Sequence, residues 1–470
     1  MRVCPQTWGA DKTVALRLYS AIVQPKLDYG CILYGSASDY SLQKLDPVLS
    51  RGVRDSGCAF RSSPINSLLA EAGIPPLSIR RQKIALQYYA RSKKTPDTPT
   101  HECITKINSN VPSMYSTRVK DLINRYDLRL DSTLEVRHTE KPTWMLDSRV
   151  VCDGYDCPPK ETTSEIMMKQ IFRDHVDEHH SNADHIYTDG SKSDQLAYAA
   201  VHGTRIRARK MNPKGSIFTA ELMAILQALW LISGSSQSTP SVIFSDSKSA
   251  IQAIQDYQNT HPIVTRIFDW LARLHARQKE VKICWVPSHV GISGNEAADQ
   301  AAKQAAEEED QVDHSYEDLP HSDHYNTIKQ VCRDAWQTMW ANIRPTENKL
   351  RAIKNTTQRW RSSTQSIRKH EVVLTRIRIG HTRLTHGYLM QGGNREPPIC
   401  ENCGENLSVK HVLAECPSYS VKRHRHFPAT VPMTDTDAIF TEMVAETPQH
   451  HFKIDPLIRY LKDIKIYDQI

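Results

Sequence analysis

Residues 183–306 alternate between short apolar stretches and amphipathic stretches, and this order constrains the fold more than any other feature of the sequence. Three consecutive apolar stretches joined by tight turns predict an antiparallel meander. Two later strands alternate with helices, which predicts a parallel half joined to that meander. The expected strands are residues 185–189, 196–202, 205–210, 241–245 and 281–286, and the expected helices are residues 219–232, 247–257 and 262–278. The predicted fold class is therefore α/β, with a mixed five-stranded sheet and flanking helices.

Four acidic residues in this region occupy positions from which their side chains can meet. Asp189 ends the first strand and Asp246 follows the fourth, and acids at the carboxyl ends of adjacent parallel strands converge at one edge of a sheet. Glu221 lies on the apolar stripe of the first helix, and Asp299 lies in an alanine-rich helix after Gly294. Four carboxylates repel one another unless cations neutralise them. Oxygen ligands favour two Mg²⁺ or Mn²⁺ ions, an arrangement that suits phosphodiester hydrolysis.

Each of these acids also has an alternative interpretation when it is taken singly. Asp189 fits a turn, Asp246 fits a helix cap and Asp299 fits an exposed helix face. Glu221 fits such an alternative poorly, because an acid in an apolar stripe is costly unless something pairs with it.

The segments IYTDGS, FTAELMAI, VIFSDSKSA and WVPSHVGISGNEAAD follow one another in this order, and residues 183–306 resemble the type I ribonuclease H domain. The resemblance implies an endoribonuclease that hydrolyses the RNA strand of RNA–DNA hybrids by a two-metal mechanism. It implies that Asp189, Glu221, Asp246 and Asp299 hold the Mg²⁺ ions. It also implies that His289 moves a proton or helps to release the cleaved phosphate, which suits a side chain that exchanges protons near neutral pH. A structural role is the alternative for His289.

Two features depart from the ribonuclease H pattern. Cellular relatives place polar residues that touch the substrate just before the helix glutamate, where this chain has Ile217 and Phe218. A basic protrusion between helices, present in some relatives, is not evident, because residues 262–278 hold only three arginines. We therefore expect hybrid affinity to depend on other parts of the chain.

Residues 1–95 predict a helical region, because apolar residues recur at helical spacing. The patterns LYSAIVQPKLDYGCILYG and LLAEAGIPPLSIRRQKIAL resemble the segment after the polymerase palm in reverse transcriptases of non-LTR retrotransposons. The chain contains no Asp-Asp dipeptide, which a polymerase uses to hold its metals, so polymerase activity is not expected. Residues 96–182 predict a proline-rich linker, in which Cys152 and Cys157 lack the partners that would complete a metal site.

The C-terminal part of the chain contains a pattern typical of a zinc site. Three cysteines and a histidine in the pattern C-x2-C-x7-H-x4-C suffice for a closed tetrahedral site with structural Zn²⁺. The predicted ligands are Cys400, Cys403, His411 and Cys416. The alternative is a chance grouping of cysteines. The surrounding segment CENCGENLSVKHVLAECPSY resembles the zinc-knuckle-like C-terminal module of non-LTR retrotransposons, which makes single-stranded nucleic acid a further expected partner.

Residues 307–470 are predicted to consist of three segments. Residues 307–365 predict an acidic hinge and a helical connector, residues 366–427 a basic segment with the zinc module, and residues 428–470 a tail. Residues 351–383 carry nine Lys or Arg against one acid. They predict either a solvated basic face or a surface that binds phosphates.

Composition sets the remaining expectations. The net charge of +7 fits a nucleic-acid partner without establishing one. The sequence shows neither an apolar run of about 18 residues nor the apolar core of a signal peptide, so we expect no membrane partner. We also expect reduced cysteines and an intracellular location in the cytoplasm or nucleus. The favoured hypothesis is a ribonuclease H from a fragment of a non-LTR retrotransposon polyprotein.

Two alternatives stay open. The first is a catalytically inactive, transposon-derived protein that binds nucleic acid through its zinc module and basic segment. The second is an interaction role for residues 1–95, which would dock to a polymerase supplied by another chain.

Overall fold

The computed structural model describes residues 5–105, 113–130, 132–136, 158, 162–235, 239–308, 318–390, 396–428, 435–446 and 452–470. The chain divides into two compact units: Met1–Ala85 with Gln330–Ile470 form one, and Leu86–Lys329 form the other. No helix in the described ranges combines the length and the apolar character needed to cross a membrane. The Cys152 and Cys157 pair lies outside the described residues.

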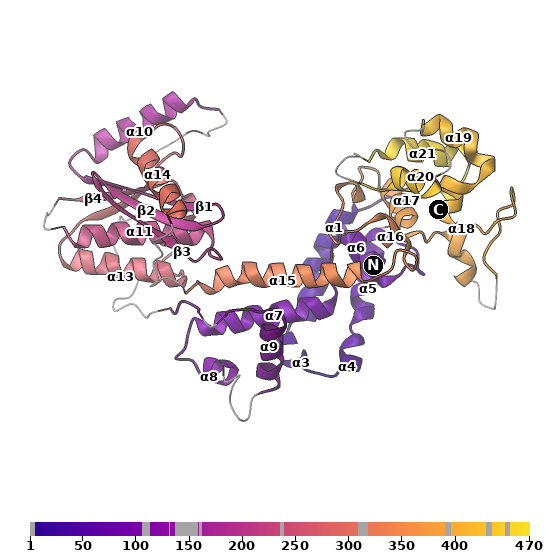
Figure 1. Cartoon of the computed structure of the whole chain (residues 1–470), viewed down its shortest axis with the longest axis horizontal. Coiled ribbons are helices and arrows are strands. Elements are labelled where there is room, and N and C mark those ends of the chain that lie inside the picture. The colour runs from indigo at the N-terminus through magenta and orange to yellow at the C-terminus, as the bar shows by residue number, and fades with distance from the viewer. Residues whose placement is uncertain are drawn as a thin grey trace. The chain divides into compact units, whose positions relative to one another are not determined.

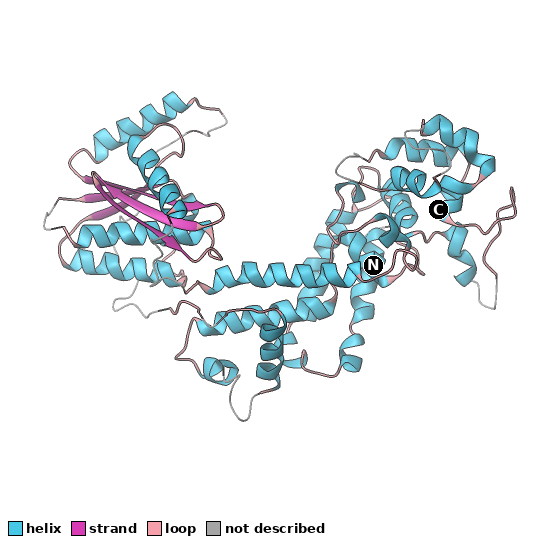
Figure 2. Ribbon diagram, in the orientation of Figure 1, coloured by secondary structure: helices cyan, strands magenta, loops and turns pink. Residues whose placement is uncertain are grey.

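The unit Leu86–Lys329 is built around one mixed sheet with the strand order β3-β2-β1-β4-β5 (Figure 1, Figure 2). Its strands are β1 (Asp184–Lys192), β2 (Leu196–His202), β3 (Arg205–Met211), β4 (Ser241–Ser245) and β5 (Val281–Trp285). Strands β1, β2 and β3 form an antiparallel meander, whereas β1, β4 and β5 run parallel. The predicted mixed five-stranded sheet with flanking helices is confirmed.

Helices cover both faces of this sheet (Figure 1). On one face, Ile186, Ile243 and Ile283 pack against buried side chains of three helices. These are α11 (Ile217–Ser233), α12 (Lys248–Gln255) and α13 (Pro262–Ala276). On the other face, Phe244 packs against α10 (Glu165–His179) and Ala199 packs against α14 (Ser293–Glu307). Successive residues of each strand point to opposite faces, so both faces of the sheet are buried.

Helix α10 lies in the stretch that the sequence predicts as a linker. Ser164 caps it by accepting a hydrogen bond from the backbone N–H of Met167, and Met168, Phe172 and Val176 bury its apolar side against β4 and β5. The same stretch contains α8 (Pro99–Thr105) and α9 (Met114–Arg125). In α8 and α9 the apolar residues are few and are separated by polar residues and prolines. The periodicity was therefore too weak to predict these two helices.

The predicted start of α11 is fixed by a partner that is distant in sequence. Ser216 accepts a hydrogen bond from the Thr219 N–H, as expected of an N-cap. The buried Asp323 carboxylate accepts two more bonds, from the Ser216 N–H at 3.0 Å and from the Thr219 hydroxyl at 2.6 Å. Asp323 lies in the first turn of α15 (His321–Ala341), within the segment 307–365 that the sequence predicts as an acidic hinge and helical connector, and its carboxylate is buried against α11.

The other unit is helical. Its N-terminal helices are α1 (Lys12–Leu18), α2 (Gln24–Asp28), α3 (Cys31–Tyr34), α4 (Asp39–Gln43), α5 (Asp46–Gly57), α6 (Ile65–Ala72) and the first part of α7 (Leu77–Lys93). Its C-terminal helices are the end of α15, α16 (Lys349–Ile353), α17 (Arg368–Ile379), α18 (Arg383–His386), α19 (Ser420–His426), α20 (Thr436–Val444) and α21 (Ile454–Asp463).

Buried charges join the N-terminal helices of this unit to its C-terminal ones. The Lys12 ammonium lies 2.9 Å from the Glu71 carboxylate, and both side chains are 2% exposed. Ser363 donates to the same carboxylate at 2.7 Å, and Arg378 lies 4.0 Å from it. The Lys12 backbone N–H donates to Glu371 on α17. Residues of the predicted segments 1–95 and 366–427 therefore make buried contacts with one another within this unit.

Some cations of the basic segment 351–383 are buried and others are exposed. Lys354, Arg368 and Arg378 are buried, so these three form neither a solvated face nor a surface for phosphates, whereas Arg361 and Arg383 are exposed. The Lys354 ammonium donates to the Ala70 carbonyl, and the Arg378 guanidinium lies 4.6 Å from the centre of the Trp360 ring. These buried charges make internal contacts that the spacing of the sequence does not reveal, and a phosphate-binding role of the exposed cations stays a prediction.

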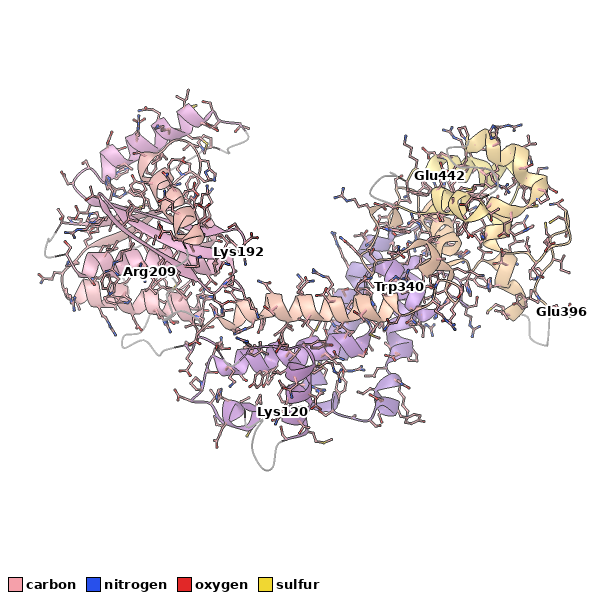
Figure 3. The ribbon with its side chains drawn as sticks, viewed as in Figure 1. Lys120, Lys192, Arg209, Trp340, Glu396 and Glu442 are labelled. Carbon is pink, nitrogen blue, oxygen red and sulfur yellow. The ribbon has the colours of Figure 1, made fainter. Side chains whose placement is uncertain are left out.

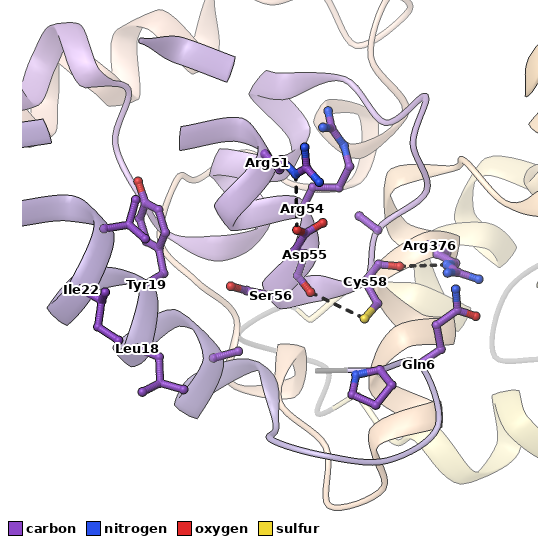
Figure 4. A pocket seen from close by; sticks show the side chains of 14 residues that line it. Gln6, Leu18, Tyr19, Ile22, Arg51, Arg54, Asp55, Ser56, Cys58 and Arg376 are labelled. Atoms are coloured by element: carbon purple, nitrogen blue, oxygen red, sulfur yellow. Dashed lines mark hydrogen bonds and ion pairs between the residues drawn. The ribbon is translucent and has the colours of Figure 1, made fainter. Parts of the chain in front are cut away.

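A cavity of about 610 Å³ opens in the helical unit (Figure 4). Leu18, Tyr19 and Ile22 form its apolar side, and Arg54 and Arg376 lie on other sides. None of the residues predicted as site residues lines it.

Candidate active site

Three of the four predicted acids meet at the carboxyl edge of the parallel strands. Carboxylate oxygens of Asp189, Glu221 and Asp246 all lie within 4.8 Å of one another. Asp189 comes from β1, Asp246 follows β4, and Glu221 comes from the second turn of α11. The Asp299 carboxyl, on α14, is within hydrogen-bonding reach of Asp189. The structure therefore brings the four predicted acids together.

Gly190 explains how α11 comes so near to β1. A Cβ atom at Gly190 would lie 3.0 Å from both the Ala220 Cβ and the Glu221 backbone nitrogen, closer than ordinary packing allows. Only glycine lets the helix approach β1 at this point. The glycine of the IYTDGS segment thus sets the position of Glu221 against Asp189.

Burial and mutual repulsion hold protons on this group. Burial, followed by the charges of Asp246 and Asp299, raises the pKa of Asp189 to about 8. Burial, followed by the charge of Asp189, raises the pKa of Glu221 to about 9. Burial also raises the pKa of Asp246. One oxygen of Glu221, Oε2, is buried and has no hydrogen-bond partner among the described groups. Such a group stores unfavourable energy that a cation relieves.

Two polar residues beside the acids were missed by the sequence analysis. The Lys303 ammonium lies 2.7 Å from Asp299 Oδ2 and fixes that carboxylate from the next turn of α14. The buried Asn295 forms a hydrogen bond with Asp246 that lowers the pKa of this acid in part. The four-residue spacing from Asp299 to Lys303 is the signal for an ion pair along a helix, so this contact could have been predicted. Asn295 offered no comparable signal.

His289 lies at the exposed rim of the group. Its backbone has a φ of 54°, in the left-handed region, which turns the loop between β5 and α14. Ligand atoms of His289, Glu296 and Asp299 lie within 4.8 Å of one another, and the His289 charge acts on Asp246. The predicted histidine is therefore beside the acids and open to solvent.

The region that carries these acids matches a known family. Residues 181–307 match the family model described as RNase H. This part of the chain is therefore similar to RNase H. A search of curated proteins found similarity to the Gag-Pol polyprotein of bovine immunodeficiency virus (strain R29), at 34% identity over 124 residues. That match covers 26% of this chain and 8% of the polyprotein, so the chain spans only a small part of that relative.

The predicted zinc ligands also come together, in the helical unit. The ligand atoms of Cys400, Cys403, His411 and Cys416 all lie within 4.8 Å of one another. The Sγ atoms of Cys400 and Cys416 are 4.0 Å apart, and Cys403 Sγ is 3.3 Å from His411 Nε2. Tetrahedral bonds of about 2.3 Å to sulfur and 2.0 Å to nitrogen require separations of about 3.5–3.8 Å. Three of the four residues are buried, as a closed structural site requires.

Proposed function

We propose that the RNase H domain of this chain is an active endoribonuclease that hydrolyses the RNA strand of RNA–DNA hybrids. The observation that carries the proposal is the group of Asp189, Glu221, Asp246 and Asp299 at one edge of the sheet, with pKa values raised to about 8 and 9 for Asp189 and Glu221. Buried carboxyls that lie close together destabilise a fold, and such groups are typical of functional sites.

The donor set fits divalent cations. All four side chains offer carboxylate oxygens, which favours Mg²⁺ or Mn²⁺ over Zn²⁺. The buried Glu221 Oε2 has no hydrogen-bond partner among the described groups, so it is available as a ligand atom. When bound, two such ions neutralise the carboxylates, activate the attacking water and stabilise the leaving oxygen.

The chain's own residues supply the remaining functions. Lys303 holds the Asp299 carboxylate, and Asn295 holds Asp246, so both acids are fixed before a substrate arrives. His289 is exposed on its loop beside Asp299, where it exchanges a proton with solvent and delivers one to the leaving oxygen. We assign the choice of the RNA strand to contacts with its 2′-hydroxyl groups.

We further propose that the chain is a fragment of a non-LTR retrotransposon polyprotein. The similarity to a retroviral Gag-Pol polyprotein supports a retroelement source. The N-terminal and zinc-module segments quoted above support the non-LTR class by resemblance. In this proposal, Cys400, Cys403, His411 and Cys416 hold one structural Zn²⁺, and single-stranded nucleic acid is a second partner.

Cleavage of a labelled hybrid tests the proposal. The full chain is incubated with an RNA–DNA hybrid, with the same RNA as a single strand, and with duplex DNA, each with and without Mg²⁺. We expect cleavage of the RNA strand in the hybrid only, and only with the metal. No hybrid cleavage in Mg²⁺ or Mn²⁺, together with retained binding, would instead favour the catalytically inactive nucleic-acid-binding protein.

A further inference from the structure

The outer strand of the sheet carries a row of arginines. Strand β3 is the outer strand of the sheet and pairs with β2, and no other described strand pairs with its outer edge. Arg205, Arg207 and Arg209 are all exposed and alternate with Ile206 and Ala208, so the three arginines share one side of the strand. We call Arg205, Arg207 and Arg209 the arginine row.

The surroundings of the row are strongly basic. Residues 192–214 contain six Lys or Arg and one acid, Asp194. Within the described part of the chain, neither Arg205 nor Arg207 forms an ion pair. Arg209 and Lys192 are labelled in Figure 3, on the sheet-containing unit. The charges of Arg205 and Arg207 are therefore not neutralised by an ion pair among the described residues.

An aromatic ring holds the middle arginine in place. The Arg207 guanidinium lies 3.6 Å from the centre of the Trp230 ring, on α11, and Trp230 is 42% exposed. Stacking on the ring fixes the arginine plane and leaves its N–H groups available to acceptors. A strand that carried charge only to prevent association with other sheets would not need this arrangement.

The register of the sheet places the β3 backbone near the Asp189 backbone. Arg207 points to the face of the sheet that α11 covers, the helix that carries Glu221, whereas Ala208 shares the α14 face with Ala199. Asp189 pairs with Ala199 of β2, and Ala199 pairs with Ala208 of β3, which lies between Arg207 and Arg209. Two strand spacings of about 4.8 Å place the β3 backbone about 10 Å from the Asp189 backbone. A nucleic-acid duplex seated on the acids is wider than this and reaches the free edge.

The length of the row also matches a polyanion. Arg205 and Arg209 are four residues apart, which is about 14 Å along a strand. One strand of a duplex carries a phosphate for about every 3.4 Å of axis, so about four phosphates face this length. Arginine binds phosphate oxygens through two parallel hydrogen bonds.

We propose that the arginine row of β3 binds backbone phosphates of the hybrid beside the cleavage site. It supplies the affinity that a basic protrusion provides in some relatives and that residues 262–278 do not. The proposal rests on the proposed function, because the hybrid is the polyanion that the neighbouring acids would cleave.

A binding comparison in the full chain tests the row. The variant is Arg207→Gln/Arg209→Gln, and the control is Arg273→Gln/Arg277→Gln. The control removes the same charge from exposed positions near the end of α13, and its Arg273 also stacks on a ring, that of Trp270. Both pairs are built into an Asp189→Asn chain, so that the hybrid is bound and not cut. Hybrid affinity is measured over a range of salt concentrations.

We expect the row variant to bind the hybrid about tenfold more weakly and its salt slope to be shallower by about 2, while the control stays near the parent chain. Equal losses in both variants, or no loss in either, would overturn the proposal, and the row would then be a protective feature of an edge strand. In an otherwise unchanged chain, the same row variant is expected to raise KM for a long hybrid and to keep kcat. Failure of the unchanged chain to cut any hybrid would contradict the proposed function, and the binding comparison would still decide the role of the row.

Discussion

Glu221 is the residue whose position is hardest to explain without a cation. It is 7% exposed, its Oε2 has no partner among the described groups, and the charge of Asp189 adds to the effect of burial on its pKa. Its position on the apolar stripe of a predicted helix already identified Glu221 as a candidate site residue in the sequence. The raised pKa values describe the protein without metal and predict how that protein responds to pH.

The metal-free chain should lose stability as pH rises. Because the pKa values of Asp189 and Glu221 are raised to about 8 and 9, the folded chain binds protons that the unfolded chain releases near pH 4. The free energy of unfolding therefore falls as the pH rises from about 4 to about 9. Mg²⁺ takes the place of these protons, so thermal unfolding should show a larger stabilisation by Mg²⁺ at pH 8 than at pH 6. Equal stabilisation at both pH values would speak against metal binding by these acids.

His289→Ala should slow the chemical step and leave substrate binding nearly intact. Loss of a group that transfers a proton costs about 10²-fold or more in kcat. His275→Ala, at an exposed position on α13, is the matched control and should keep full activity. Steady-state kinetics on the hybrid measure both variants. A kcat unchanged by His289→Ala would leave this histidine with a structural role.

At the scale of elements, the sequence was most informative where a pattern and a local signal agreed. The five strands and α11 were predicted because Ser216, Gly234 and the alternation of apolar residues mark them directly. Helix α10 was missed because only its contact with β4 and β5 makes its apolar side meaningful. Convergence of Asp189 and Asp246 followed from strand order. The contact of Asp323 with α11 depends on residues more than a hundred positions apart, which spacing cannot reveal.

Replacement of a single ligand is expected to remove the metal from the zinc module. Cys403→Ser removes one of three thiolates, and structural sites of this kind contribute strongly to folding. Native mass spectrometry of the full chain should show one zinc in the parent and none in the variant. Cys103→Ser, at an exposed position that is not among the predicted ligands, should keep the zinc. A parent chain that contains no zinc would mean that these cysteines are a chance grouping and form no zinc site.

At the scale of the whole molecule, buried charges decide how distant segments fold together. Burial alone would raise the pKa of Glu71, but Lys12, Arg378 and Lys354 outweigh burial and lower it to about 2. Burial dominates on Lys12 and lowers its pKa despite the neighbouring acid. Glu71 thus compensates several buried cations at once, which ties the N-terminal helices to the C-terminal ones within the helical unit.

Glu71→Gln should destabilise this unit by about 3–5 kcal/mol, because it leaves buried cations without their counter-charge. The control is Asp55→Asn, which breaks an exposed pair with Arg51 whose side chains are 72% and 83% exposed, and which should change stability by less than about 1 kcal/mol. Denaturant unfolding followed by tryptophan fluorescence compares the two. Equal small effects would mean that the segments do not depend on this buried group.

The most direct test of the central claim compares hybrid cleavage by Asp189→Asn and Asp194→Asn chains in Mg²⁺. Asp189 lies at the centre of the acids, whereas Asp194 is exposed at the end of the same hairpin. The predicted result is a loss of cleavage by about 10³-fold or more for Asp189→Asn, with hybrid binding retained, and unchanged cleavage for Asp194→Asn. Mg²⁺-dependent cleavage retained by Asp189→Asn would contradict the assignment of these acids as the catalytic metal site.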